Sequence, residues 1–146
     1  MRTIAFDIVF GTLEREKHSD ELFLAQIRNR NTISEKEKDF LRRLSYGPIE
    51  RAIESDADIN HLSTLPVTKM KPEIRTLLRM GVYELFYMDS VPPSATCNEM
   101  VMLARKKGYD SLSRFVNGVL RNIAREDSEA LREKIADDCR TAGQRL

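Results

Sequence analysis

A row of arginines around an amide is the arrangement of polar side chains that best suggests chemistry. It comprises Arg114, Asn117, Arg121 and Arg125. Their spacing of i, i+3, i+7 and i+11 places all four on one side of a helix. Guanidinium groups bind phosphates, and an amide can pair with the edge of a base. The row is therefore a candidate nucleic-acid surface, although a solvated helix face produces the same pattern.

The segment that must position this row is the predicted helix Leu112–Arg125. Its opposite side is apolar and consists of Leu112, Phe115, Val116, Val119 and Ile123. An apolar face of this kind needs a core to cover it. We therefore expect the helix to pack on the body of the protein and to turn its arginines outward.

A second row of cations lies on a predicted helix that starts at Pro72. Arg75, Arg79 and Tyr83 are spaced i, i+4 and i+8, a geometry that could grip a strand and stack a base. Alternatively, Tyr83 covers the edge of the core. Gly81 lies on the apolar face of the same helix, where glycine costs helix stability. Its presence predicts the close approach of a neighbouring helix.

Positive charge is concentrated in the middle of the chain. Residues 69–125 contain ten Lys or Arg and five Asp or Glu, whereas the segments on either side each sum to −2. Clustered cations suit a polyanionic partner. Another predicted helix starts at about Ala95, ends with Arg105, Lys106 and Lys107, and is capped by Gly108. Cations at the end of a helix complement its dipole, which is an alternative explanation for these three. The predicted RNA-binding set is Arg2, Lys69, Lys71, Arg75, Arg79, Tyr83, Lys106, Lys107, Arg114, Asn117, Arg121 and Arg125.

Composition excludes several classes of protein. The 146 residues, 41% of them hydrophobic, fit one globular domain. No apolar run is long enough for a membrane span, and the first ten residues lack the features of a signal peptide, so we expect a cytoplasmic protein. Cys97 and Cys139 form no CxxC pair, and with only His18 and His61 beside them the sequence predicts neither a metal site nor a cofactor.

Helical spacing of apolar residues runs through the whole chain and predicts an all-α bundle of six or seven helices within one domain, residues 1–146. The main boundary signals are a start near Arg2, a cap at Ser19 or Asp20, a capping box at Ser34–Glu37, a kink or division near Gly47 caused by Pro48, and a short last helix from Ser128 followed by a frayed tail at 141–146. No glycine-rich phosphate loop, nucleophile elbow or catalytic triad is present, which favours a binding module over an enzyme.

Several segments resemble the NusB family. The most specific are Tyr83-Glu84-Leu85, Val91-Pro92, Asn98-Glu99 and residues 115–120, FVNGVL. The resemblance, which covers Arg2 to Arg125, implies an RNA-binding domain of two packed three-helix subbundles. In NusB, it implies boxA RNA and the ribosomal protein NusE as partners. In the rRNA cytosine-5 methyltransferase RsmB, it implies a domain that helps a methyltransferase domain to engage rRNA.

The segment Tyr46–Arg51 and residues 120–122 are more similar to the RsmB branch. Two departures bear on these alternatives. Only Arg2 stands where NusB proteins often have an arginine-rich stretch, and the chain lacks the cofactor loop and catalytic cysteines of a methyltransferase. We therefore expect a non-catalytic rRNA-binding domain, with a NusB-type adaptor that binds boxA RNA and NusE as the alternative. A third possibility is that the chain is part of a longer enzyme.

Overall fold

The computed structural model describes the backbone of residues 1–144 and the side chains of residues 1–140, and the described residues form eight α-helices. They are α1 (Arg2–Arg15), α2 (Ser19–Arg28), α3 (Glu35–Glu50), α4 (Ala52–Leu62), α5 (Pro72–Tyr87), α6 (Pro93–Lys106), α7 (Ser113–Ala124) and α8 (Ser128–Gln144). Short 3₁₀ turns at Val67–Lys69 and Asp110–Leu112 precede α5 and α7. The all-α prediction is confirmed, but the helix number of six or seven was too low for the described residues.

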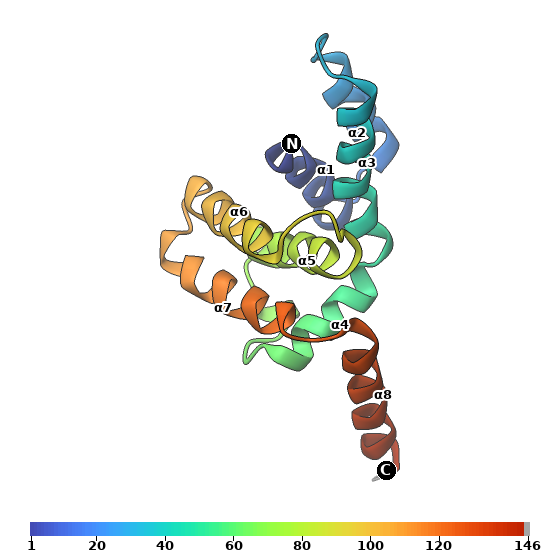
Figure 1. The fold of residues 1–146 in the computed structure, drawn as a ribbon, viewed down its shortest axis with the longest axis vertical. Helices are drawn as coiled ribbons and strands as arrows, with labels where there is room; N and C mark the ends of the chain where they lie inside the picture. The colour runs from blue at the N-terminus through green and yellow to red at the C-terminus, as the bar shows by residue number, and fades with distance from the viewer. Residues whose placement is uncertain (145–146) are drawn as a thin grey trace.

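The helices form two sets of three that share one core (Figure 1). Helices α1, α2 and α3 pack together, as do α5, α6 and α7, and α4 joins the two sets. Helix α5 lies in the centre and contacts α1, α3, α4, α6 and α7. Consequently most of its side chains are buried, including Ile74, Leu77 and Leu78, which explains its strongly apolar sequence.

Close packing of α5 against α7 depends on Gly81, as its sequence position predicts. A Cβ atom added to Gly81 would lie 2.6 Å from Cδ2 of Leu120 on α7. Leu120 is fully buried, so the missing side chain is what allows the two helices to approach. This contact holds α7, and with it the arginine row, against the central helix.

The capping box predicted at the start of α3 is present, with Ser34 Oγ accepting from the Glu37 N–H at 3.1 Å and the Glu37 carboxylate accepting from the Ser34 N–H at 3.2 Å. The predicted division of the helix near Gly47 lies later in the chain, at Arg51. Helix α3 continues through Pro48 to Glu50 and gives way to α4 at Arg51. Pro48 removes only one backbone donor, and its burial in the core holds the helix together around it.

Three other boundaries differ from their predictions. Helix α2 starts at Ser19 after His18, and neither Ser19 nor Asp20 acts as the cap. Helix α6 starts at Pro93 rather than Ala95, because proline suits the first turn of a helix. Helix α8 is 17 residues long rather than short and reaches Gln144, so residues 141–144 are helical rather than frayed. Residues 145–146 of the predicted tail lie outside the described residues.

Within residues 1–144, no helix combines the length and the apolar character needed to cross a bilayer.

Candidate nucleic-acid interface

A groove of about 450 Å³ separates the exposed sides of α6 and α7. We call it the α6–α7 groove. Its lining residues are Asn98, Val101, Met102 and Arg105 from α6, and Ser113, Arg114, Asn117 and Arg121 from α7. Three of these residues are arginines, two are asparagines, and none is acidic. The groove therefore combines positive charge with amide groups and a partly apolar floor.

The turn between the two helices sets the geometry of this groove. Gly108 has a φ of +90°, a conformation that favours glycine. The Gly108 N–H donates to the Arg105 carbonyl at 3.0 Å, and the Tyr109 N–H donates to the Ala104 carbonyl at 2.9 Å. These two bonds form the Schellman motif that ends α6. As predicted, Gly108 terminates the helix, and the chain then turns back so that α7 packs along α6.

Arg121 is the central cation of the groove and has only neutral side-chain partners there. Its Nε donates to Oδ1 of Asn117 at 3.2 Å, and its Nη2 lies 3.5 Å from Oδ1 of Asn98. Amide oxygens orient the guanidinium without neutralising it. A phosphate or a base that enters the groove therefore meets an oriented, uncompensated positive charge.

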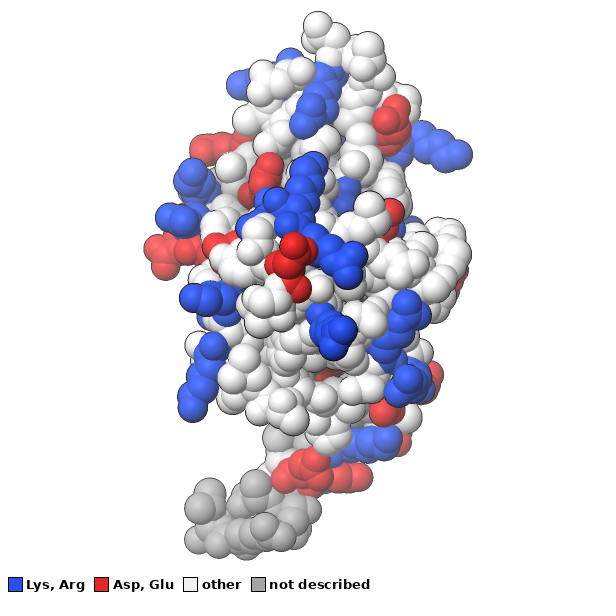
Figure 2. Space-filling view, turned by 90° about the vertical axis from the view of Figure 1, so that its left-hand side faces the viewer, with Lys and Arg blue, Asp and Glu red and all other residues white. Residues whose placement is uncertain are grey.

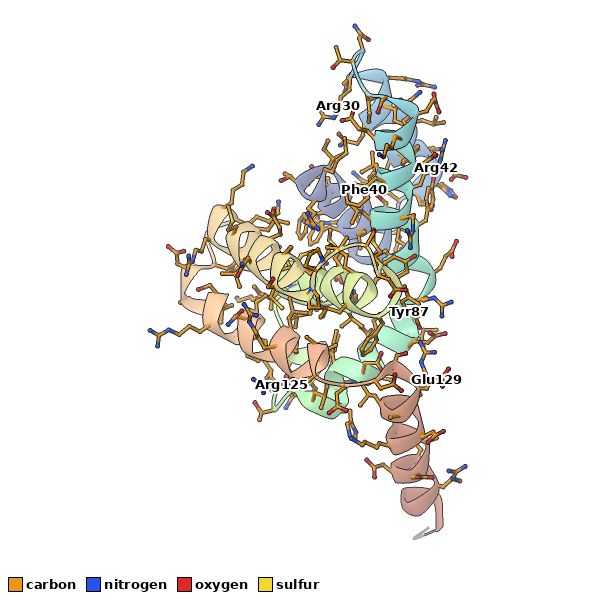
Figure 3. The ribbon with its side chains drawn as sticks, viewed as in Figure 1. Arg30, Phe40, Arg42, Tyr87, Arg125 and Glu129 are labelled. Atoms are coloured by element: carbon orange, nitrogen blue, oxygen red, sulfur yellow. The ribbon has the colours of Figure 1, made fainter. Side chains whose placement is uncertain are left out.

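The other arginines of this face are largely accessible. Arg114 is exposed, and Arg105 is 61% exposed, with Asp110 3.8 Å away as its partner. Arg125, just beyond the end of α7, donates to the Asn122 side chain at 3.2 Å and does not line the groove (Figure 3). Figure 2 shows this side of the molecule, where Lys and Arg side chains follow one another down the middle and are interrupted by acidic side chains.

The second row of cations does not lie on a free surface, which corrects the expectation that it faces outward. Nε of Arg75 donates to Glu14 at 2.8 Å. Arg79 donates to both carboxylate oxygens of Asp56, at 2.7 and 3.0 Å, and to Glu14 at 2.9 Å. The Arg79 residue is 9% exposed. These ion pairs join α5 to α1 through Glu14 and to α4 through Asp56. Both acidic partners lie far from the arginines along the sequence.

The Arg75 hydrogen bond lowers the pKa of Glu14 from its ordinary value, and burial opposes this shift. Tyr83, the third residue of the row, packs its ring against Gly47 of α3 and stacks on Tyr87 at 5.3 Å. Covering the edge of the core is thus what Tyr83 does in this structure.

The remaining predicted cations fall in three places. Arg2 pairs with the buried Glu84 at 2.7 Å, and Lys107 lies 4.0 Å above the Phe6 ring. Lys106 lines a hollow of about 300 Å³ between α6 and the N-terminus of α1. Lys69 and Lys71 are exposed beside a separate apolar hollow. The predicted set is thus divided between the groove, internal ion pairs and two other surfaces.

Five residues of the groove were not among the predicted RNA-binding residues, namely Asn98, Val101, Met102, Arg105 and Ser113. Asn98, Met102 and Arg105 are spaced i, i+4 and i+7, so they share a side of α6. This spacing is visible in the sequence and could have identified them. Arg105 was instead attributed to the helix dipole, and Asn98 appeared only as part of a family motif.

Among the described residues, no three His, Cys, Asp or Glu side chains come together as metal ligands. Cys97 is buried and Cys139 is exposed, and both are free thiols. His61 approaches Asp138 at 3.4 Å and lies away from the groove.

A family model described as NusB family matches residues 1–125. The chain belongs to the NusB family. The match ends just after α7 and includes both helices of the groove. The resemblance predicted from the sequence is therefore confirmed.

Relatives of two kinds are similar to this NusB-family chain. A probable ribosomal RNA small subunit methyltransferase B from Bacillus subtilis (strain 168) is 32% identical over 86% of this chain and 28% of the relative. The corresponding protein of Synechocystis sp. is also 32% identical, over 88% and 28%. A transcription antitermination protein NusB from Bacillus velezensis is 39% identical over 61% and 69%. The chain thus spans little more than a quarter of its methyltransferase relatives.

Solved structures show the same fold. The NusB-family chain matches a crystal structure of antitermination factors NusB and NusE in complex with dsRNA, with a TM-score of 0.75 and 26% identity over 84% of this chain and 92% of the other. It matches T. maritima NusB with a TM-score of 0.74 and 26% identity over 90% and 94%.

Proposed function

We propose that this chain is a non-catalytic RNA-binding domain and that single-stranded rRNA occupies the α6–α7 groove. The observation that carries the proposal is the composition of the groove, in which three arginines and two asparagines line about 450 Å³ without a carboxylate. Arginines supply phosphate contacts and can stack on unpaired bases. Asparagine side chains can pair with base edges. Val101 and Met102 offer an apolar surface for one base face.

The choice of rRNA rests on the relatives rather than on the groove. The two methyltransferase relatives are named for ribosomal RNA and align with this chain over 86% and 88% of its length. The chain accordingly acts as the NusB-like domain of an rRNA methyltransferase system. A structural neighbour was solved with dsRNA, which supports RNA as the ligand class.

The test is a charge reversal in the groove, Arg114→Glu with Arg121→Glu. Fluorescence anisotropy measures binding of a labelled rRNA-derived single strand between 50 and 200 mM salt. The wild-type affinity should fall with salt, because phosphate contacts release counterions from the strand. Losing two contacts should make the slope of log K against log salt shallower by about 1.4. We expect at least about tenfold weaker binding at the lowest salt, since two charge-assisted contacts are replaced by repulsion.

A matched control carries the same change of charge elsewhere. Arg28→Glu with Arg30→Glu alters two exposed arginines at the end of α2 and in the loop that follows, far from the groove (Figure 3). This control should retain most of the wild-type affinity. An equal loss of affinity in both variants would show that binding depends only on overall charge and not on the groove. An unchanged affinity in the groove variant, with intact helicity, would refute the proposal.

A second function, that of a protein adaptor, is favoured by a different surface. A hollow of about 290 Å³ lies between the 3₁₀ turn before α5, the start of α5, and the start of α7. Its residues are Leu65, Met70, Ile74, Leu112 and Phe115, with Lys69 and Lys71 beside them. Leu65 is 38% exposed there. Exposed apolar surface with a polar rim is typical of protein interfaces, and a structural neighbour was solved with NusE.

On this alternative, a ribosomal protein of the NusE type docks at the apolar hollow. Pull-down from a lysate, with and without nuclease, separates the two functions. Leu65→Asp places an unpartnered charge in the hollow and should remove a nuclease-resistant partner while leaving RNA affinity unchanged. If the partner is lost with nuclease or survives Leu65→Asp, the adaptor function at this hollow is excluded.

A further inference from the structure

Helix α8 belongs to neither of the two three-helix sets. It projects away from the two three-helix sets, and α4 is the helix against which it packs (Figure 1). It also lies beyond residues 1–125, which the NusB family model matches. Little apolar surface fixes it, because Leu131 is the only fully buried side chain among its residues 128–140. The stability of its docked position therefore depends on a few polar contacts.

These contacts come from Arg132 and Asp138. The Arg132 guanidinium donates to Oε2 of Glu54 at 2.9 Å and also contacts the Tyr87 hydroxyl. Nδ1 of His61 lies 3.4 Å from Oδ2 of Asp138. Both pairs cross the boundary between α8 and the rest of the chain, and one of them includes a histidine that is charged only when protonated.

Asp58 of α4 lies beneath this seam. It is 2% exposed and lines a hollow of about 310 Å³ together with Arg132, Ile135 and Ala136 of α8. Undocking of α8 would remove these covering side chains and expose the carboxyl group to water. The charged groups that face it are Glu54 and His61 on α4 and Arg132 on α8.

Burial is the main influence on this carboxyl group. The pKa of Asp58 is raised from 3.8 to about 6, chiefly by burial, and the nearby Glu54 charge contributes in the same direction. The positive charges of Arg132 and His61 act in the opposite direction and do not compensate. No described residue donates a hydrogen bond that would hold the ionised form. Asp58 is therefore protonated more readily while α8 covers it than it would be in water.

We propose that α8 is a proton-controlled arm, which is held on α4 when Asp58 carries a proton and is loosened when Asp58 ionises. A carboxyl group that binds a proton more tightly in the docked state favours docking in acid. This contribution is complete below about pH 4 and is lost as the pH rises through about 6.

Hydrogen exchange in the full chain tests this proposal. Protection factors of α8 amides, corrected for the intrinsic exchange rate, are compared at pH 5 and pH 8, with α5 amides as an internal reference. A pKa of about 6 in the docked arm and 3.8 in the released arm corresponds to about tenfold stronger docking at pH 5 than at pH 8. We expect the protection of α8, relative to α5, to fall by that factor.

Three variants test whether Asp58 is the group that causes the pH dependence of α8 protection. Asp58→Asn cannot ionise, so α8 should stay protected at pH 8 and lose most of its pH dependence. His61→Gln leaves Asp58 in place and should retain the pH dependence. Asp39→Asn alters an exposed carboxylate on α3 and should behave as wild type. An equal pH dependence in Asp58→Asn, or equal protection of α8 at pH 5 and 8, would overturn the proposal.

A direct titration makes the test independent of folding of the variants. In the wild-type chain, the Asp58 carboxyl carbon should titrate in an NMR experiment with a midpoint near 6. A midpoint near 4 would show that α8 does not shield the Asp58 carboxyl group from water. That result would also refute the proposal that α8 is a proton-controlled arm.

Discussion

Arg79 and Arg121 show how far the neighbourhood of one residue decides its role. Both lie in arginine rows of helical spacing, and the sequence offers no local feature that separates them. Arg79 meets Asp56 and Glu14, whereas Arg121 meets only asparagine amides. Glu14 is 65 residues away from Arg79 in the chain. The pattern therefore predicted candidate cations, but tertiary packing determined which of them keep a free charge.

Packing within the protein does not explain why residue 118 is a glycine. A Cβ atom added there would meet nothing within 4 Å, and the residue is exposed on α7 between Arg114 and Arg121. Gly118→Ala should therefore stabilise the helix by about 0.5–1 kcal/mol, as measured by chemical unfolding. If RNA lies close to this bare stretch of helix, the same substitution should weaken binding in the anisotropy assay.

Gly108→Ala provides a control with the opposite expected sign. Gly108 also has open space around it, but its φ of +90° is unfavourable for a residue with a side chain. This variant should lose about 1 kcal/mol. A loss of stability in Gly118→Ala would show that the methyl group meets a neighbour.

At the scale of elements, Glu14 ties three helices together. Its carboxylate on α1 accepts from Arg75 and Arg79 of α5, and Arg79 in turn pairs with Asp56 of α4. Glu14→Gln removes the negative charge and leaves two partly buried guanidinium groups undercompensated. We expect the free energy of unfolding to fall by about 3 kcal/mol, as observed when one partner of a buried pair is removed.

The same substitution should change the response to acid. Because the pKa of Glu14 is lowered by Arg75, its stabilising contribution is present above about pH 4.5 and is lost as the pH falls below that value. Wild-type stability, measured by urea unfolding between pH 3 and pH 7, should therefore decrease more steeply in acid than that of Glu14→Gln. Parallel pH curves for the two proteins would contradict this role.

Elements differed in how well the sequence located them. The capping box at Ser34 and the close approach at Gly81 depend on side chains within a few residues or on one absent side chain, and both predictions are confirmed. The division near Gly47 was placed too early, because it lies at Arg51, and the short final helix is wrong. Proline weakens a helix locally, but burial of Gly47 and Pro48 in the core overrides that preference.

For the molecule as a whole, charge distribution along the chain was only a partial guide. The central excess of +5 in residues 69–125 indicated a cationic region, but Arg75 and Arg79 are paired with acids outside that region. Arg105, Arg114 and Arg121 come together because α6 and α7 pack side by side. Family resemblance predicted the fold correctly, and the groove itself could be recognised only once the two helices were placed side by side.

The position of the N-terminus has a practical consequence. Met1 and Arg2 line a hollow with Met102 and Lys106, and Met102 also lines the α6–α7 groove. An affinity tag fused to Met1 would lie beside the surface under test, and a polyhistidine sequence would add its own attraction for nucleic acid. Purification handles and surface-immobilisation groups are better attached at the other end of the polypeptide, beyond α8, where the helix carries them away from the groove (Figure 1).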